Sequence, residues 1–301
     1  MIPDSVMHSS LHKRWLVGQK EMFSPLAIRT TVMDAYVDRS WYGKRGLYAV
    51  AAFLACANDW TRLLLSWRRL LNEADANLDV FHMTDFMSRK RRPYNEWGEE
   101  KWKRLLRDLV RTINENVDYG CAGVLLPSGY QAMLELHKAR TREGKPSLGT
   151  NPYAICADTC IGLAAKRFDT VGWNNRRIAY CFESGDQGLP EFQASVSRIL
   201  ASEKYRDENK IIAATAVPKR EAPALQTSDI LAYELTHGRA DRGEMGETLS
   251  ALAARIPIEP IYIDDNLMAE IVEKYTPEVA RQITREYRLR IRRQKKRTRR
   301  K

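Results

Sequence analysis

The chain has 301 residues, 44% of them hydrophobic, which is enough to build a core for one large domain or two small ones. No stretch approaches the roughly 20 apolar residues that cross a bilayer, and residues 1–20 carry charges where a signal peptide has an apolar core, so we expect a cytoplasmic protein without membrane contact. The net charge is +11, and residues 285–301 alone carry +10. The rest of the chain is therefore close to neutral, so we do not expect it to bind polyanions in general.

The first predicted elements are two strands joined by a turn. Residues 31–38 alternate between apolar and polar, which is typical of a half-buried strand. Residues 47–56 are an apolar run, and Gly43 and Gly46 lie between the two segments. This pattern predicts an antiparallel hairpin at the start of the fold.

After the hairpin, helical and extended patterns alternate along the chain. Apolar residues at helical spacing predict helices over 60–71, 99–113, 152–168, 190–204 and 227–238, with further helical segments over 265–275 and from 277 onward. Short apolar runs predict strands over 119–126, 177–183 and 211–217. We therefore expect an α/β fold with a mixed sheet flanked by helices.

We find no repeat and no flexible linker that would divide the chain. The predicted organisation is an N-terminal extension over 1–30, a main domain over 31–240, a helical appendage over 241–284 and a basic tail over 285–301. A block of like charge this dense binds nucleic acid through its phosphates, or serves only to keep the protein soluble. The sequence predicts no oligomeric state.

Cysteine and tryptophan residues are expected in the core. The five cysteines are scattered, and no set of four Cys and His ligands is spaced for zinc, which indicates reduced thiols. Trp60, Trp67, Trp97 and Trp102 fall on or beside apolar helix faces, so they are predicted to pack internally and not to stack on bases.

Three acids stand where α/β proteins place functional groups. Asp38 ends the first predicted strand, Glu183 ends a later one, and Asp229 lies at the start of a predicted helix. Side chains at strand ends and helix starts face a crevice. Mg²⁺ and Mn²⁺ prefer oxygen ligands, and phosphodiester chemistry needs several carboxylates from separate elements.

Four segments together resemble the domain-of-unknown-function 3800 family of bacteria and phages. They are Ala35-Tyr36-Val37-Asp38-Arg39-Ser40, Phe81-His82-Met83-Thr84-Asp85-Phe86, Phe182-Glu183-Ser184-Gly185-Asp186, and the stretch Leu225-Gln226-Thr227-Ser228-Asp229-Ile230-Leu231-Ala232-Tyr233-Glu234. Their order and rough spacing match the family over residues 32–238. The resemblance implies a ribonuclease H-like fold with acids grouped at one end of the sheet, in a family whose activity is largely unassigned.

The resemblance also marks particular residues. It points to the following positions, the last two more weakly: Asp38, His82, Glu183, Asp229, Asp85 and Asp186. The chain departs from the family at the first motif, where Arg39 replaces an acid and Trp41 replaces glycine. Losing an acid there weakens the expectation of a complete two-metal centre.

Several polar residues near these motifs have two open interpretations. His82 could act as a general base, a metal ligand or a phosphate contact, or it could be a satisfied polar residue at a strand end. Asp85 could orient His82 or cap the following helix. Lys219 and Arg220 could bind substrate phosphates or be solvated loop charges.

The sequence therefore predicts a metal-dependent nuclease or related phosphoryl-transfer enzyme. Asp38, Glu183 and Asp229 would bind Mg²⁺ or Mn²⁺, His82 would assist, and the basic tail Arg285 to Lys301 would hold nucleic acid. One alternative is a non-catalytic protein on the same fold that binds nucleic acid or a partner. Another is a phage or defence component that acts on a nucleotide or a partner protein.

Overall fold

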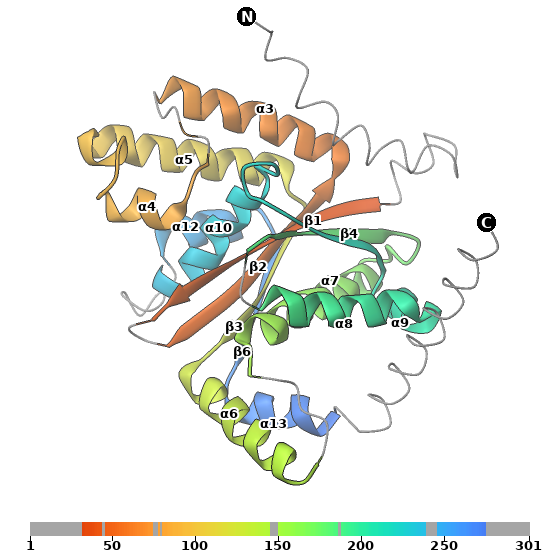
Figure 1. Ribbon diagram of the computed structural model, residues 1–301. Coiled ribbons are helices and arrows are strands. Elements are labelled where there is room, and N and C mark those ends of the chain that lie inside the picture. Colours follow the sequence, from red (N-terminus) through yellow and green to blue (C-terminus); the bar gives the residue numbers. More distant parts are fainter. Residues whose placement is uncertain are drawn as a thin grey trace, which may run out of the picture.

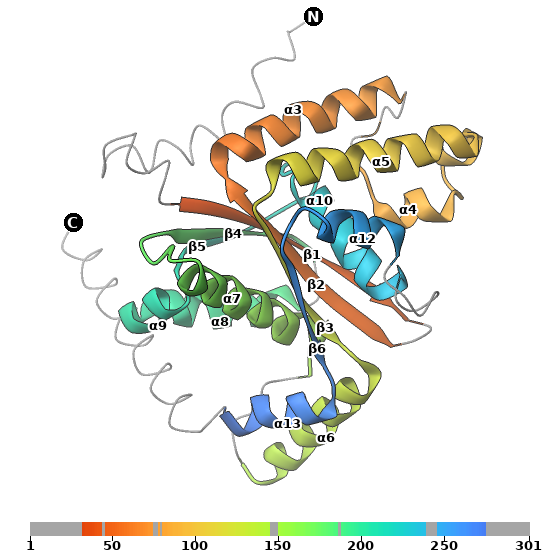
Figure 2. The ribbon, with the colours of Figure 1, turned by 180° about the vertical axis from the view of Figure 1, so that it is seen from behind.

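A computed structural model describes residues 32–43, 46–74, 78, 80–144, 150–185, 188–238 and 246–274. Its strands form one mixed sheet in the order β5-β4-β1-β2-β3-β6, with helices on both faces (Figures 1 and 2). The strands are β1 (Val32–Tyr42), β2 (Leu47–Cys56), β3 (Tyr119–Leu125), β4 (Arg177–Glu183), β5 (Ile211–Val217) and β6 (Ile258–Ile263). The predicted α/β class with a mixed, helix-flanked sheet is confirmed.

Strand β1 joins the antiparallel and parallel halves of the sheet. It pairs antiparallel with β2, from Met33 opposite Cys56 to Tyr42 opposite Leu47, which confirms the predicted hairpin. On its other side β1 runs parallel to β4, and β4 runs parallel to β5. The prediction that the first strand ends at Asp38 is wrong, because residues 39–42 continue to pair with β2.

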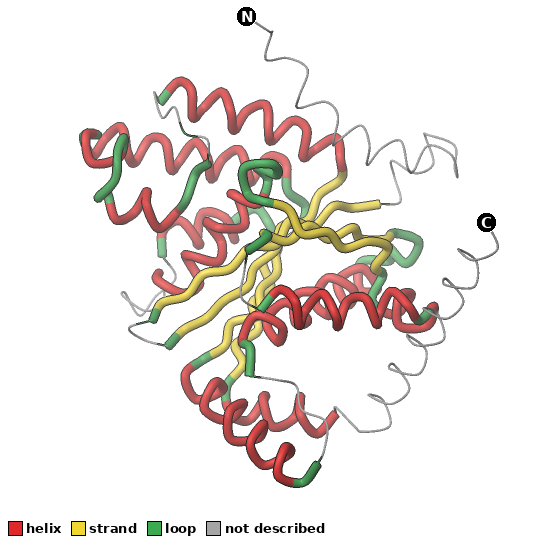
Figure 3. The backbone as a smooth tube through the Cα atoms, in the orientation of Figure 1, coloured by secondary structure: helices red, strands yellow, loops and turns green. Residues whose placement is uncertain are grey.

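The two faces of the sheet carry different helices (Figure 3). Met33, Ala35 and Val37 of β1 point into a core shared with α7, while Tyr36, on the alternate positions, packs against the core on the other face. On the first face lie α7 (Pro152–Thr170), α8 (Leu189–Ala201) and α9 (Glu203–Glu208). On the second lie α3 (Ala57–Glu73), α4 (Met83–Ser88), α5 (Glu99–Asn116), α10 (Leu225–Tyr233) and α12 (Glu247–Ala253).

Most predicted helices are present, with shifted ends. The helix predicted over 190–204 is two helices, because the side chain of Ser202 accepts a hydrogen bond from the amide of Tyr205 and starts α9. The helix predicted over 227–238 begins at Leu225 and changes into the π-helix η2 (Glu234–Gly238). Trp60, Trp67 and Trp97 are buried, as predicted, and all five cysteines are free thiols.

Helix α12, strand β6 and the helix that follows β3 are absent from the sequence prediction, whereas the helix expected over 265–275 is present. Pro127, predicted to end a strand, also starts helix α6 (Pro127–Arg142). Proline suits the first turn of a helix because a backbone amide there would have no partner within the helix. The stretch over 241–284, predicted as a helical appendage, contains α12, α13 (Asp265–Lys274) and strand β6. Strand β6 extends the sheet beside β3, and Pro260 is accommodated because β6 is an edge strand.

The N-terminal extension over 1–30 and the basic tail over 285–301 lie outside the described residues. Within the described ranges, no helix combines the length and apolar character needed to cross a membrane.

Candidate functional site

The acidic residues predicted as a site gather at one end of the parallel part of the sheet, where β4 and β5 end and β1 parts from β4. Strands β1 and β4 pair only as far as Val37 opposite Phe182, so they part just before Asp38 and Glu183. Lys219 follows the end of β5 by two residues. Ligands of open α/β sheets bind in the crevice at the carboxyl ends of the strands.

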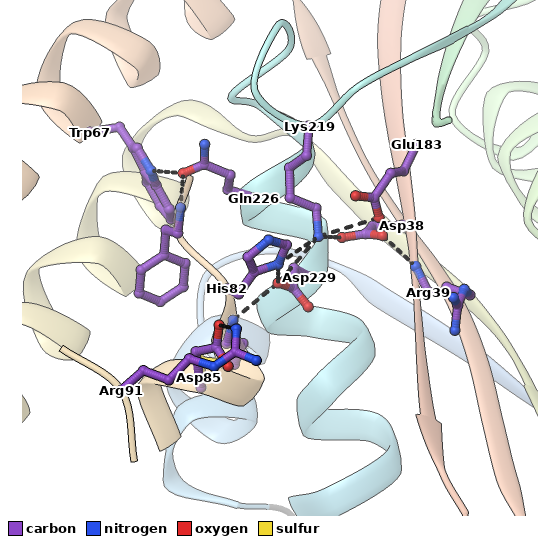
Figure 4. Close-up of polar contacts among 12 residues, drawn as sticks. Asp38, Arg39, Trp67, His82, Asp85, Arg91, Glu183, Lys219, Gln226 and Asp229 are labelled. Atoms are coloured by element: carbon purple, nitrogen blue, oxygen red, sulfur yellow. Dashed lines mark hydrogen bonds and ion pairs between the residues drawn. The ribbon is translucent and has the colours of Figure 1, made fainter. Parts of the chain in front are cut away.

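A single ammonium group lies at the centre of these acids (Figure 4). Lys219 Nζ is 2.6 Å from Asp38 Oδ2, 3.4 Å from Glu183 Oε2 and 3.4 Å from Asp229 Oδ2. The same nitrogen is 3.5 Å from Nδ1 of His82. We call Asp38, Glu183 and Asp229 the carboxylate cluster. The structure therefore brings together the four predicted principal residues, with Lys219 between them.

The cluster is closed on one side and open on the other. The side chains of Asp38, Lys219 and Asp229 are 1%, 6% and 8% exposed, whereas those of Glu183 and His82 are 23% and 44% exposed. A ligand would therefore approach over Glu183 and His82. Lys219, predicted as a phosphate contact or a solvated loop charge, is instead buried, while its neighbour Arg220 is exposed.

Burial and charge act against each other at these groups. Burial raises the pKa of Asp38 well above its usual range; Lys219 opposes this shift, and Asp229 and Glu183 add to it. Burial also disfavours the charged form of Lys219, but the three carboxylates outweigh it and raise the pKa of the ammonium. Burial favours the neutral form of Asp229, but its hydrogen bonds to His82 and the Met83 amide and the charge of Lys219 keep its pKa below the usual value.

Two residues of helix α10 fix the backbone on either side of His82. Oε1 of Gln226 accepts hydrogen bonds from the Trp67 indole at 3.0 Å and from the amide of Phe81 at 3.2 Å. Oδ2 of Asp229 accepts one from the amide of Met83 at 3.0 Å. The backbone that carries the half-exposed imidazole of His82 is thus held on both sides by one face of α10.

Hydroxyl groups fix α10, and η2 that continues it, to strand β1. The Ser228 hydroxyl donates to the carbonyl of Tyr36 at 2.7 Å, and the hydroxyls of Thr236 and Ser40 are 2.9 Å apart. Asp38 lies between Tyr36 and Ser40 on β1 and faces α10. These contacts set the distance between Asp38 and Asp229.

Gln226 and Ser228 hold the site together, and the sequence prediction assigns neither of them a role. Both lie in the motif over 225–234 that contains Asp229. The signal that points to Gln226 is its spacing of three from Asp229, which places the two on one helix face. The predicted helix begins at residue 227, one position too late for that argument.

Arg39, at which the sequence departs from the family that it resembles, takes no part in the cluster. Successive residues of a strand point to opposite faces of the sheet, so Arg39 and Asp38 diverge. Figure 4 shows the Arg39 side chain directed away from Lys219. The backbone amide of Arg39 donates to Oδ1 of Asp38 at 2.8 Å and thereby helps to orient that carboxylate.

Of the two weaker candidates, Asp85 does not join the cluster. Asp85 lies in the first turn of α4, where it pairs with Arg91 at 3.1 Å; His82 occupies the cap position, and its side chain makes no capping bond. The prediction that Asp85 caps the helix is therefore wrong. Asp186 lies outside the described residues.

The donors of the cluster fit a divalent ion in their chemistry. All three are hard carboxylate oxygens, and Oδ2 of Asp38 is buried without a hydrogen-bond partner among the described residues, its neighbour being the Lys219 ammonium. As they stand, no three acidic, His or Cys side chains of the described residues are arranged as a metal site. An ion would therefore have to displace Lys219 and draw the carboxylates closer together.

A scan against protein-family models and a search of curated proteins both gave no match to this chain. The family resemblance therefore stays a prediction, and functional inference depends on the geometry of the cluster.

Proposed function

We propose that this chain is a divalent-metal-dependent nuclease or a related phosphoryl-transfer enzyme that acts on nucleic acid. The supporting observation is that oxygens from β1, β4 and α10 all lie within 3.4 Å of the Lys219 ammonium. Acids from three separate elements thus surround a point of cationic charge. Phosphodiester chemistry on a hard metal ion requires such a set of oxygen donors.

Asp38, Glu183 and Asp229 would hold Mg²⁺ or Mn²⁺. When bound, the ion supplies charge stabilisation for the attacked phosphate and makes a coordinated water more acidic. His82 is the exposed group of the site, and its Nδ1 is 3.6 Å from Oδ2 of Asp229. An imidazole held in this way is suited to take a proton from an attacking water.

Lys219 has a second role in this proposal. Its ammonium neutralises the carboxylates, and its flexible four-carbon stem allows it to move aside when an ion enters. The released ammonium would then lie nearer the exposed side of the cluster, where it can pair with a phosphate of the substrate. We also propose, from the motif resemblance, that the sheet is ribonuclease H-like and that the protein is a cytoplasmic member of the domain-of-unknown-function 3800 family.

One observation favours a second function. Lys219 already neutralises charge of the carboxylates. Among the residues that the structure describes, no three His, Cys, Asp or Glu side chains are arranged to hold a metal ion. If the ammonium is never displaced, the chain is a non-catalytic nucleic-acid-binding or partner-binding protein whose lysine has replaced the ion.

Cleavage assays on the purified full chain separate the two functions. We expect cleavage of DNA or RNA with Mg²⁺ or Mn²⁺ that stops on addition of EDTA and is lost in Asp229→Asn. Asp207→Asn is a matched control, because Asp207 is a half-exposed acid paired with Arg177 outside the cluster. Absence of cleavage with every divalent metal tested, on both nucleic acids, would favour the non-catalytic function.

A further inference from the structure

A short basic loop lies beside the site and takes no part in the carboxylate cluster. It comprises four consecutive cations, Arg89, Lys90, Arg91 and Arg92, between α4 and the short helix η1 (Tyr94–Glu96). We call these residues the basic loop. Outside residues 285–301 the chain is close to neutral, so four adjacent cations are a local concentration of charge.

Most of this charge faces solvent. The side chains of Arg91 and Arg92 are 75% and 84% exposed, and Lys90 is exposed as well. Arg91 pairs with Asp85 and Arg92 with Glu96, whereas no ion pair holds Lys90 in the described part of the chain. Exposed pairs of this kind contribute little to stability, so folding does not explain the charges of Lys90, Arg91 and Arg92.

The loop backbone is held firmly. Arg89 closes α4 in the left-handed conformation, with φ 51°, its amide donates to the carbonyl of Asp85, and its guanidinium donates to the carbonyl of Trp97. The rings of Phe86 and Trp97 both pack against Tyr94, with centroids 5.2 Å apart in each pair. A charged surface on a fixed backbone loses little conformational entropy when it binds.

The position of the loop relates it to the site. Helix α4 has six residues, so it separates His82 from the basic loop by about 9 Å along its axis. Phosphates recur every ~3.4 Å along the axis of one strand of a duplex. The loop therefore lies within a few nucleotides of a phosphate bound at the carboxylate cluster.

We propose that the basic loop binds the sugar-phosphate backbone of the nucleic acid and sets which phosphate lies at the carboxylate cluster. This inference rests on the proposed substrate class. Arginine pairs with phosphate through two parallel hydrogen bonds, and lysine pairs with it as a point charge. A fixed loop beside the site can align the strand, which distinguishes its role from the predicted, sequence-blind binding by residues 285–301.

The test uses the full chain and a fluorescent single-stranded oligonucleotide in EDTA. Anisotropy titrations over a range of salt concentrations compare the wild type with the triple variant Lys90→Ala, Arg91→Ala, Arg92→Ala. We expect the triple variant to bind more weakly. We call the slope of the logarithm of the binding constant against the logarithm of the salt concentration the salt slope. In the triple variant it should be smaller by about 0.7 for each phosphate that the loop no longer neutralises, or roughly 2 for the three cations.

The matched control removes three exposed lysines elsewhere, by Lys138→Ala, Lys166→Ala and Lys204→Ala on α6, α7 and α9. It should keep nearly the wild-type slope. A second variant, Lys90→Glu, breaks no ion pair and should weaken binding in the same direction as the triple variant.

Several results would overturn the proposal. They are an unchanged slope in the triple variant, an equal reduction in the control, or weaker binding to anionic lipid vesicles with oligonucleotide binding intact. Because the titration contains EDTA and needs no cleavage, it distinguishes failure of this proposal from failure of the metal-dependent function.

Discussion

Helices α7 and α10 lie against opposite faces of one sheet, and they are buried by opposite kinds of side chain. Helix α7 presents apolar and small residues, and its backbone at Cys156 comes so close to β3 that a Cβ on Gly123 would lie 2.5 Å from a carbonyl oxygen. Helix α10 buries four consecutive polar residues, Gln226, Thr227, Ser228 and Asp229. The first face is packed like an ordinary core, and the second contains the candidate site.

This difference indicates what each helix is for. A buried polar group destabilises the fold unless it is hydrogen-bonded, and apolar residues would fill the same space with less risk. Each polar residue of α10 has a partner, from the Trp67 indole for Gln226 to the Tyr36 carbonyl for Ser228. We infer that α7 mainly stabilises the sheet, whereas α10 positions Asp229 and His82.

Among the variants that compare the two faces of the sheet, removal of the Lys219 ammonium should have the largest effect on stability. Lys219→Met leaves the buried carboxylates of Asp38 and Asp229 without their counterion, so we expect the free energy of unfolding to fall by about 3–5 kcal/mol in EDTA at neutral pH. Urea denaturation measures this decrease. Lys166→Met, at an exposed site on α7, should change stability by less than about 0.5 kcal/mol.

The same variant should respond to pH in one direction. Burial already raises the pKa of Asp38, and removal of the ammonium raises it further. A carboxyl group with a folded pKa above its unfolded value of about 3.9 binds more protons in the folded state, so stability is lost as pH rises through that window. The difference in free energy of unfolding between the wild type and Lys219→Met should therefore become smaller toward pH ~4. A difference that grows on acidification would contradict this.

Removal of the Gln226 side-chain amide, which holds the segment around His82, should have the next largest effect on stability. Gln226→Leu leaves the Trp67 indole and the Phe81 amide buried without their acceptor. At about 1–3 kcal/mol for each of the two unsatisfied donors, we expect a decrease of roughly 2–6 kcal/mol by urea denaturation. Gln131→Leu, on the exposed side of α6, is the control and should have little effect. Equal stabilities of the two variants would show that Gln226 does not hold this segment.

A substitution on the apolar face should lower stability without altering the site. Gly123→Ala forces β3 and α7 apart and should reduce the free energy of unfolding by about 1–3 kcal/mol, with metal affinity unchanged in the folded protein. Gly162→Ala makes the same chemical change on the exposed side of α7, where no atom lies within 4 Å, and should stabilise by about 0.5–1 kcal/mol. A change in metal affinity in Gly123→Ala would mean that the two faces are not independent.

The smallest effect is expected for the hydroxyl that fixes α10 to β1. Ser228→Ala removes one hydrogen bond to the Tyr36 carbonyl and should cost about 1 kcal/mol, together with a weaker metal affinity, because Asp229 is less firmly placed opposite Asp38. Thr170→Ala, at the exposed end of α7, removes a hydroxyl that bonds within its own helix and should leave metal affinity unchanged. Equal metal affinities in the two variants would show that Ser228 does not help to position Asp229.

The hydrophobic pattern was sufficient to predict most of the sheet. The strand predictions over 177–183 and 211–217 match β4 and β5, because both segments are continuous apolar runs, which favour strands of a parallel sheet. Strand β6 was missed because it contains Glu259 and Pro260 and its residues are mostly half-exposed, so it shows neither an apolar run nor clear alternation. Pairing with β3, which no local pattern reveals, makes it a strand.

The site was predicted in part for the same physical reason. Asp38 and Glu183 could be selected because each follows an apolar strand segment, and the pairing of β1 with β4 stops just before both residues. Lys219 could not be placed, because its burial depends on carboxylates that are distant in sequence. Its own neighbours, Pro218 and Arg220, are exposed and indicate only a loop.

The most direct measurement is a calorimetric titration of Mn²⁺ into the wild type, Asp38→Asn and Lys219→Met. If the carboxylate cluster is a cation site that Lys219 fills, binding is lost in Asp38→Asn, and Lys219→Met binds tighter than the wild type by about tenfold or more, equivalent to about 1.4 kcal/mol. Equal binding of Mn²⁺ by all three proteins, or none by Lys219→Met, would contradict a cation site at these carboxylates.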